Sequence, residues 1–170
     1  MTIKMKTLMI SVTITAIMTT FLIMSTINNL TSLALAQGPP TIMINLTGEE
    51  EVPPVQTEAT GMAEITPMGP DSIAYNINAT NIEGATAGHI HFGNAGENGP
   101  IVVTLFKYDS PMNQVSENGT ITADKLEGPL AGKQISDLAT AGANGTLYIN
   151  IHTEKNPNGE IRGQGGNPSA

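Results

Sequence analysis

The chain has 170 residues, with 7 Lys+Arg, 15 Asp+Glu, 3 His, no Cys and no Trp. A length of this order suits one domain, or one domain with a leader. The absence of cysteine excludes disulfide frameworks, cysteine-ligated metal sites and cysteine nucleophiles. A net charge of -8 argues against nucleic-acid binding. Abundant Gly and Pro with few charged residues are typical of a turn-rich β protein.

The N-terminus has the three parts of a secretory signal peptide. Lys4 and Lys6 form a short basic region, residues 7–24 carry no charge, and an Ala-Leu-Ala cleavage pattern ends at Ala36. We predict a signal peptide over residues 1–36. The alternative is an uncleaved anchor, because about 18 apolar residues nearly span a bilayer. Export would place the mature protein outside the cytoplasm, secreted or at the cell surface, and no membrane span is expected once the leader is removed.

Residues 37–164 read as short strands separated by Gly, Pro and Asn turns. This pattern predicts an all-β fold, either an antiparallel β-sandwich or a Greek-key barrel. At most one short helix is expected, and residues 165–170 are small and polar enough to form a flexible tail. The expected strands are residues 41–46, 59–66, 72–79, 87–92, 101–106, 119–123, 147–153 and 160–163, and the expected helix is 134–141.

Four Asn-x-Thr sequons occur in the part of the chain that follows the leader. They begin at Asn45, Asn78, Asn118 and Asn144. Each suits a surface position in an exported protein, where N-glycosylation is chemically accessible. N-glycosylation at these four positions is therefore a hypothesis. The domain that follows the leader is also expected to be acidic, given the net charge of the chain.

Three histidines carry the sharpest hypothesis about chemistry. His89 and His91 are one residue apart in an expected strand, so both rings point to one face while Ile90 points to the other. His152 lies in the alternating segment 147–153. If the two strands are neighbours, the three imidazoles form a cluster that suits copper or zinc with an open fourth position. Because only neutral imidazole binds a metal, affinity should fall below about pH 6.5.

The same histidines have structural interpretations. A His-x-His strand can form an ordinary solvent face, and neutral histidines can hydrogen-bond a carboxylate such as Glu160. Glu160 and Arg162 share one face of an expected strand and are expected to pair across strands. The consecutive acids 49–51 are expected to be a solvated cluster. No nucleophile elbow, phosphate loop or dinucleotide fingerprint appears.

Four segments, in order, resemble the CHRD family, a domain named after its repeats in chordin and common in secreted microbial proteins. They are LTGEEEVPPV at 46–55, AGHIHFGNAGENGP at 87–100, IVVTL at 101–105 and LYINIHTEKNPNGEIRGQ at 147–164. The resemblance implies an immunoglobulin-like β-sandwich. In chordin these domains belong to an extracellular antagonist of bone morphogenetic proteins. The resemblance therefore implies a non-catalytic extracellular binding or structural module, with an extracellular protein or glycan as partner.

The His-x-His strand also resembles the copper-binding strand of Cu/Zn superoxide dismutase. The resemblance implies that His89, His91 and His152 match three copper-type ligands. The chain departs from that family because it has no fourth histidine, no separate zinc ligands, no disulfide and only one arginine, Arg162. Its negative charge would also repel superoxide. A copper- or zinc-binding protein is thus the alternative to a non-catalytic module, and a dismutase-like metalloenzyme is a remote one.

Overall fold

The computed structural model describes residues 40–166, so the expected leader and residues 167–170 of the expected tail lie outside the described residues. The regular structure of the described part is mainly β-strand, which confirms the all-β prediction. It contains one α-helix, and no helix within it is long and apolar enough to cross a membrane. The strands are β1 (Ile42–Thr47), β2 (Thr60–Pro67), β3 (Ser72–Thr80), β4 (Ala85–Phe92), β5 (Ile101–Met112), β6 (Val115–Thr122), β7 (Leu147–Thr153) and β8 (Ile161–Gln164). The helices are α2 (Ile135–Ala143) and the short 3-10 turns η1 (Gly48–Glu50), η2 (Ala123–Lys125) and η3 (Gly128–Leu130).

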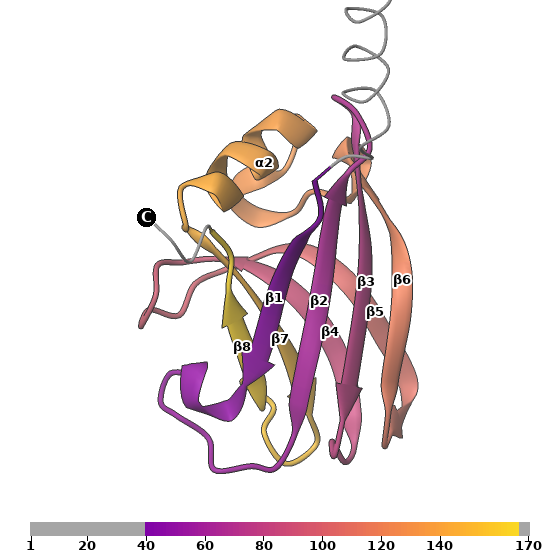
Figure 1. The fold of residues 1–170 in the computed structure, drawn as a ribbon, viewed down its shortest axis with the longest axis vertical. Helices are drawn as coiled ribbons and strands as arrows, with labels where there is room; N and C mark the ends of the chain where they lie inside the picture. Colours follow the sequence, from indigo (N-terminus) through magenta and orange to yellow (C-terminus); the bar gives the residue numbers. More distant parts are fainter. Residues whose placement is uncertain (1–39, 167–170) are drawn as a thin grey trace, which may run out of the picture. The chain divides into compact units, whose positions relative to one another are not determined.

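All eight strands belong to one antiparallel sheet with the order β5-β4-β7-β8-β1-β2-β3-β6. The sheet curls so that β1, β2, β3 and β6 lie in front of β4, β5 and β7 (Figure 1). Strand β8 pairs with both β7 and β1 and joins the two halves. The predicted division into two packed sheets, as in an immunoglobulin-like sandwich, is therefore not confirmed.

The core lies on the inner side of the curled sheet. Alternating residues of the strands point inward, so one face of each strand is apolar and buried. Burying one such side chain contributes about 1.5–3 kcal/mol, and the sum stabilises a domain that has no disulfide. The fully buried aliphatic side chains include Leu46, Ile77, Ile82, Val102, Val103, Val115, Ile121, Ile151 and Ile161.

Strands β5 and β6 are longer than their sequence patterns predict. Pro111 near the end of β5 reads as a turn signal, but β5 is an edge strand, where proline removes no ladder hydrogen bond. Near the start of β5, the backbone N–H of Glu127 donates to Val102 O at 2.8 Å. The N–H of Thr104 donates to the Glu127 carboxylate at 2.9 Å. The segment after β6 thus covers part of an edge that would otherwise be free to pair with another chain.

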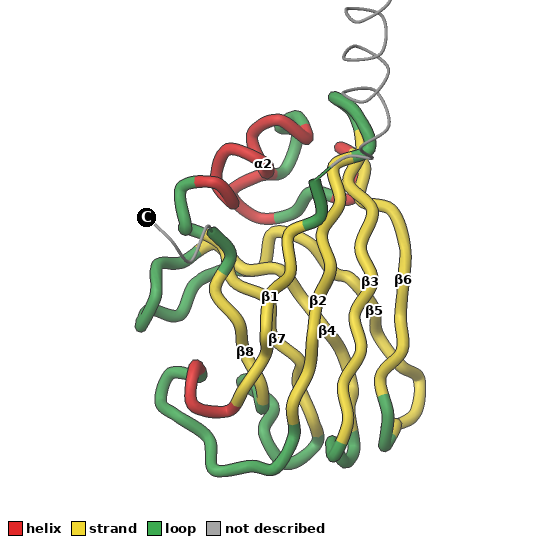
Figure 2. Tube along the Cα trace, viewed as in Figure 1, coloured by secondary structure: helices red, strands yellow, loops and turns green. Residues whose placement is uncertain are grey.

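Helix α2 lies at one end of the sheet, and loops lie at both ends (Figure 2). It buries Ile135, Leu138 and Ala141, which share one helical face. At its start, Gln134 and Asp137 form a capping box, in which the Gln134 N–H donates to Asp137 Oδ2 at 2.9 Å. The predicted helix is confirmed, with its boundaries shifted by one or two residues.

Candidate metal centre

Strands β4 and β7 are antiparallel neighbours, and their register places the histidine-bearing segments side by side. His89 lies opposite Asn150, and His91 lies opposite Tyr148. Alternate residues share a face, so the three imidazoles lie on the outer side of β4 and β7 while Ile90 is buried in the core. One ring nitrogen from each of His89, His91 and His152 lies within 4.8 Å of the other two. The structure therefore brings together all three residues that the sequence singled out, and their role as metal ligands stays a prediction.

Backbone carbonyls fix the tautomer of two of these rings. His91 Nδ1 lies 2.9 Å from Gly99 O, and His152 Nδ1 lies 2.9 Å from Pro157 O. A carbonyl oxygen only accepts, so each Nδ1 must carry the proton and donate it. In a neutral ring the Nε2 atom then keeps a bare lone pair. His89 Nδ1, His91 Nε2 and His152 Nε2 are all buried and have no hydrogen-bond partner.

The three imidazoles favour the neutral form. Burial, followed by the neighbouring His152 and His91, lowers the pKa of His89 to about 4. Burial also lowers the pKa of His91 and of His152, against the opposing effect of their bonds to backbone carbonyls. A proton on one ring would make protonation of the other two rings less favourable, because two positive charges repel each other strongly where little water screens them. The cluster therefore presents lone pairs rather than positive charge at neutral pH.

A stack of three planar groups holds His91 in place. The His91 and Tyr148 rings are parallel within 7° at a centroid distance of 4.8 Å. The Arg162 guanidinium lies 3.5 Å from the centroid of the Tyr148 ring, within cation–π range. Gly99 contacts both rings, because its N–H donates to the Tyr148 hydroxyl at 3.1 Å and its carbonyl accepts from His91. The bond to Gly99 O thus orients the His91 ring within its plane, and the stacking on Tyr148 restrains the face of the ring.

The loop between β4 and β5 is tied to β8. Arg162 donates to Asn94 O at 3.0 Å, and Gln164 Nε2 donates to Gly93 O at 2.9 Å. Arg162, for which the sequence predicts pairing across strands, donates to this loop and to Gln164 of its own strand. The loop in turn supplies the Gly99 carbonyl that orients His91. The bonds from β8 to the loop therefore help to orient His91.

Glu160 binds hydroxyl and amide groups rather than a histidine. Its carboxylate accepts from the hydroxyls of Thr57 and Thr153, both at 2.7 Å, and from the amide of Asn156 at 3.1 Å. Although burial alone would raise the pKa of Glu160, these three bonds hold it below its usual value. Glu160 shapes the turn after β7, which supplies the Pro157 carbonyl to His152. The alternative in which a histidine bonds this carboxylate is therefore not observed.

The prediction of a solvated acidic cluster is correct for Glu49 and Glu50 and wrong for Glu51. The first two are exposed, whereas Glu51 is only 4 % exposed. Glu51 follows the short turn η1, which directs its side chain over β7 instead of into solvent. Burial raises the pKa of Glu51 to about 7, although Arg162 and a bond from Asn150 act in the opposite direction. The sequence signal that distinguishes Glu51 from its two neighbours is its place directly before Val-Pro-Pro in the first segment that resembles the CHRD family.

Together these side chains form a buried polar layer on the outer side of β4, β7 and β8. Within residues 40–166, five buried side-chain atoms have no hydrogen-bond partner, and every one of them belongs to this layer. Folded proteins pair nearly all buried polar atoms, so such a concentration calls for an explanation. All five can supply a lone pair, which is the property that binds a cation. The layer comprises Glu51, His89, His91, Tyr148, Asn150, His152 and Arg162, and the five atoms are His89 Nδ1, His91 Nε2, His152 Nε2, Glu51 Oε1 and Asn150 Oδ1.

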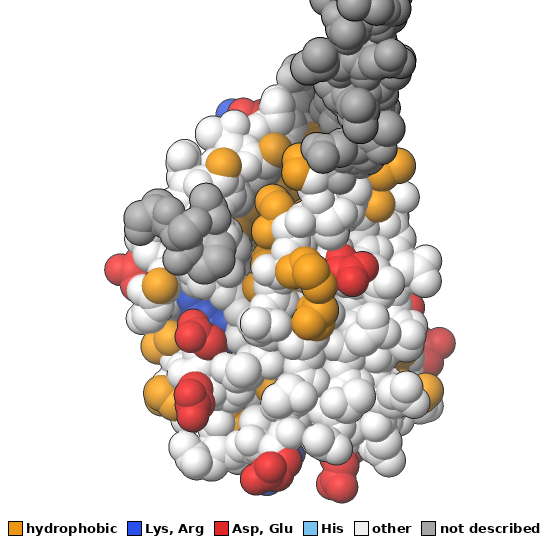
Figure 3. Space-filling model, viewed as in Figure 1, with side chains coloured by type: hydrophobic (Ala, Val, Ile, Leu, Met, Phe, Trp, Pro, Cys, Tyr) orange, Lys and Arg blue, Asp and Glu red, His pale blue; other side chains and the backbone are white. Residues whose placement is uncertain are grey.

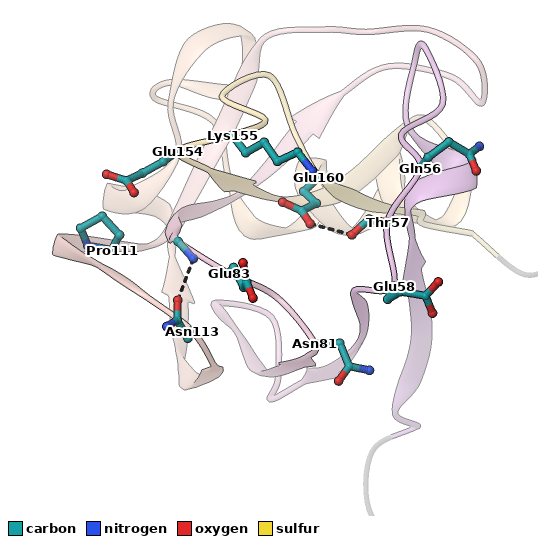
Figure 4. A pocket seen from close by; sticks show the side chains of 11 residues that line it. Gln56, Thr57, Glu58, Asn81, Glu83, Pro111, Asn113, Glu154, Lys155 and Glu160 are labelled. Carbon is teal, nitrogen blue, oxygen red and sulfur yellow. Dashed lines mark hydrogen bonds between the residues drawn. The ribbon is translucent and has the colours of Figure 1, made fainter.

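A groove in the described part lies apart from the histidines. It has a volume of about 710 Å³, and none of the three histidines lines it. Figure 4 shows Glu160 and Lys155 on one wall, with Glu58 and Asn81 facing them across the opening. Glu160 is already satisfied by the Thr57 hydroxyl. The groove therefore adds nothing to the histidine cluster.

The opposite half of the sheet has a different outer surface. On β1, β2, β3 and β6 most outward residues are exposed amides and hydroxyls, although Met43, Met62 and Glu64 also point outward, and Figure 3 shows this side as mostly neither apolar nor charged. We call it the exposed Asn/Thr face. Three sequon asparagines lie on it, and the fourth, Asn144, is exposed after α2, so all four occupy the expected surface positions. The face comprises Asn45, Thr60, Asn76, Asn78, Thr80, Ser116, Asn118 and Thr120.

Comparison with known proteins gives one family. The model described as the CHRD domain matches residues 42–164, which is nearly all of the described part. No curated protein and no solved structure matches the chain.

Proposed function

The chain belongs to the CHRD-domain family, and from this premise we propose that it is an extracellular, non-catalytic module that holds one copper or zinc ion. His89, His91 and His152 are the proposed ligands. The observation that carries the proposal is the convergence of three buried, unpartnered ring nitrogens within 4.8 Å of one another.

The residues fit such an ion in chemistry and in position. Imidazole suits both copper and zinc. Metal-bound histidines commonly donate their other ring nitrogen to a carbonyl or carboxylate, as His91 and His152 do to Gly99 O and Pro157 O. With metal–nitrogen bonds of about 2.0–2.1 Å, two ligand atoms of one tetrahedral ion lie about 3.4 Å apart. The widest pair of ring nitrogens would therefore move together by about an ångström when an ion binds. When bound, the ion would accept the lone pairs that the layer leaves unpaired.

Export supports the extracellular part of the proposal. The basic start, the apolar run and the cleavage pattern before Gln37 indicate secretion or display at the cell surface. The exposed Asn/Thr face is available to an extracellular protein or glycan, since its amides and hydroxyls are free to form new hydrogen bonds. We regard metal binding and partner binding as two properties of one module.

Dismutase activity is not part of the proposal. The proposed site has only three histidine ligands. Arg162, the only arginine of the chain, is buried against Tyr148. No basic side chain of the described layer is free to guide an anion to the cluster. A metalloenzyme would become the better proposal only if metal-dependent turnover were observed.

The test is to purify the protein without a histidine tag, measure its copper and zinc content and titrate both metals by calorimetry. We expect one ion per chain. His152→Ala should weaken binding strongly, because it leaves two of three ligands. If the variant lacking all three histidines binds as tightly as the parent, the proposed site is wrong.

A further inference from the structure

Asn150 is the residue of the buried polar layer whose position the three-histidine site does not explain. It lies on β7 between Tyr148 and His152, directly opposite His89, with its side chain on the same face as the three rings. It is 1 % exposed, and its Oδ1 atom is buried without a partner. A buried amide oxygen in this state destabilises the folded protein unless something binds it.

The nitrogen end of the amide lies among hydrogen-bond acceptors. Asn150 Nδ2 lies 3.4 Å from Asn158 O and donates toward it. A Cβ added to Gly159 would lie 2.3 Å from Glu51 Oε1 and 2.6 Å from Asn150 Nδ2, so the carboxyl and the amide nitrogen meet over this glycine. Two acceptors, Glu51 and Asn158 O, therefore surround Nδ2. They fix which end of the amide is nitrogen and turn Oδ1 away from them.

The oxygen end lies on the face of the sheet that carries the histidines. Asn150 is directly opposite His89 and two residues from His152 along β7, and residues opposite each other on one face have Cβ atoms about 4.5–5.5 Å apart. His91 Nε2 is one of the three unpartnered nitrogens. Oδ1 and the ring nitrogens thus share one buried region, and each brings a lone pair to it.

We propose that Asn150 Oδ1 is a fourth ligand of the ion held by His89, His91 and His152, and that Glu51 keeps the amide in the ligating orientation. This inference rests on the proposed function. It fills from this chain the fourth position that a three-histidine site leaves open. Glu51 is then a positioning residue that acts through Asn150.

The proposal predicts which metals the site prefers. A carbonyl oxygen is a hard donor that suits divalent ions, whereas copper(I) prefers softer ligands. Asn150 should therefore raise the affinity for zinc(II) and contribute little to the affinity for copper(I). Three imidazoles alone would show no such separation when Asn150 is changed.

The experiment compares the parent protein with Asn150→Leu and Asn150→Asp. Leucine has a similar shape and no oxygen, whereas aspartate keeps an oxygen at the ligating position. We expect Asn150→Leu to lower zinc(II) affinity by about 10–100-fold. Copper(I) affinity should stay within about threefold of the parent. Asn150→Asp should restore zinc(II) binding to at least the parental level.

A second readout is the visible absorption of the cobalt(II)-loaded protein, which depends on the number and type of ligands. The spectrum should change in Asn150→Leu and not in Asn76→Leu, which makes the same substitution on the exposed Asn/Thr face. Unfolding of each metal-free variant is measured alongside. If Asn150→Leu does not fold, the zinc(II) affinity and cobalt(II) spectrum of Asn150→Asp decide.

The possible results separate the two proposals. Parental zinc(II) affinity and an unchanged cobalt(II) spectrum in folded Asn150→Leu would overturn the role of Asn150 and leave the three-histidine site standing. Equal losses of zinc(II) and copper(I) affinity would indicate a purely structural role and would also overturn it. A parent protein that binds no metal would overturn the proposed function, and this inference with it.

Discussion

The outer side of the sheet has two halves with the same alternation of polar and core residues, and they differ in whether the polar residues are exposed or buried. On β1, β2, β3 and β6, polar residues alternate with core residues and remain in solvent, as Asn76 and Asn78 do around the buried Ile77. On β7, Tyr148 and Asn150 alternate with core residues in the same way, yet they are 2 % and 1 % exposed. The difference comes from the segments that cover β4, β7 and β8 and have no counterpart on the other half.

This comparison shows what covering a polar face does to its chemistry. On the exposed Asn/Thr face, water can satisfy every amide and hydroxyl, so the residues are replaceable. In the buried polar layer, histidine pKa values fall, that of Glu51 rises, and five atoms are left without partners. Burial removes water as a hydrogen-bond partner from these polar residues, so a bound cation would stabilise their unpaired atoms.

The largest expected difference between the halves is in metal binding. Replacing His89, His91 and His152 by alanine together should reduce bound copper or zinc from one ion per chain to none, because it removes every nitrogen ligand. The matched triple replacement of Asn76, Asn78 and Asn118 should leave metal content unchanged. Elemental analysis of both variants after equal metal exposure tests this, and a similar loss in both would refute the assignment to one half.

The covering loop is the next target. Gly99→Ala would place a Cβ 1.8 Å from Phe92 O and disturb the contacts to Tyr148 and His91. We expect it to destabilise the protein by about 1–3 kcal/mol. Gly142→Ala in α2 meets only ordinary contact and should be neutral or stabilising. Urea unfolding measures both, and equal effects would mean that the loop carries no special strain.

The buried histidines should make the metal-free protein sensitive to acid. The pKa of His89 is about 4 in the folded state against its usual 6.5, so the folded state binds fewer protons than the unfolded state in this window. Stability should therefore be complete above pH 6.5 and fall toward pH 4, by about 3 kcal/mol for His89 at most, because solvent screening reduces the effect at this half-buried ring. His89→Gln should flatten this slope in urea unfolding with a chelator present.

Glu51 should act with the opposite sign. Its pKa rises from 4.5 to about 7 on folding, so the folded state binds more protons between these values. Its contribution is largest below pH 4.5 and is lost as the pH rises to 7, by about 1–2 kcal/mol. Glu51→Gln should remove this loss, whereas Glu50→Gln, at an exposed position, should not. Identical pH profiles for the two variants would contradict the buried setting of Glu51.

The smallest effect is expected on the exposed half. Asn78→Thr keeps a polar, strand-compatible residue at an exposed position and should change stability by less than about 0.5 kcal/mol. It should also leave metal affinity unchanged. Thermal unfolding and calorimetry give both values, and a large loss in either would show that this face is not a passive surface.

Much of this structure follows from local patterns. The bounds of β7 are those expected from the alternation in residues 147–153, because an uninterrupted period of two specifies a strand. The same rule places His89 and His91 on one face of β4. Strand β5 extends past its pattern to Met112, since an edge strand tolerates polar residues and proline that would end a central one.

The sequence by itself determined the all-β class, the short helix, the family and the three histidines, because each depends on residue type and nearby spacing. Only the tertiary structure decided that β4 and β7 are neighbours, that Glu51 is buried while Glu50 is not, and that Arg162 holds the loop between β4 and β5. These outcomes depend on contacts between segments far apart in the chain. Burial and hydrogen-bond satisfaction are properties of such contacts, and no local pattern encodes them.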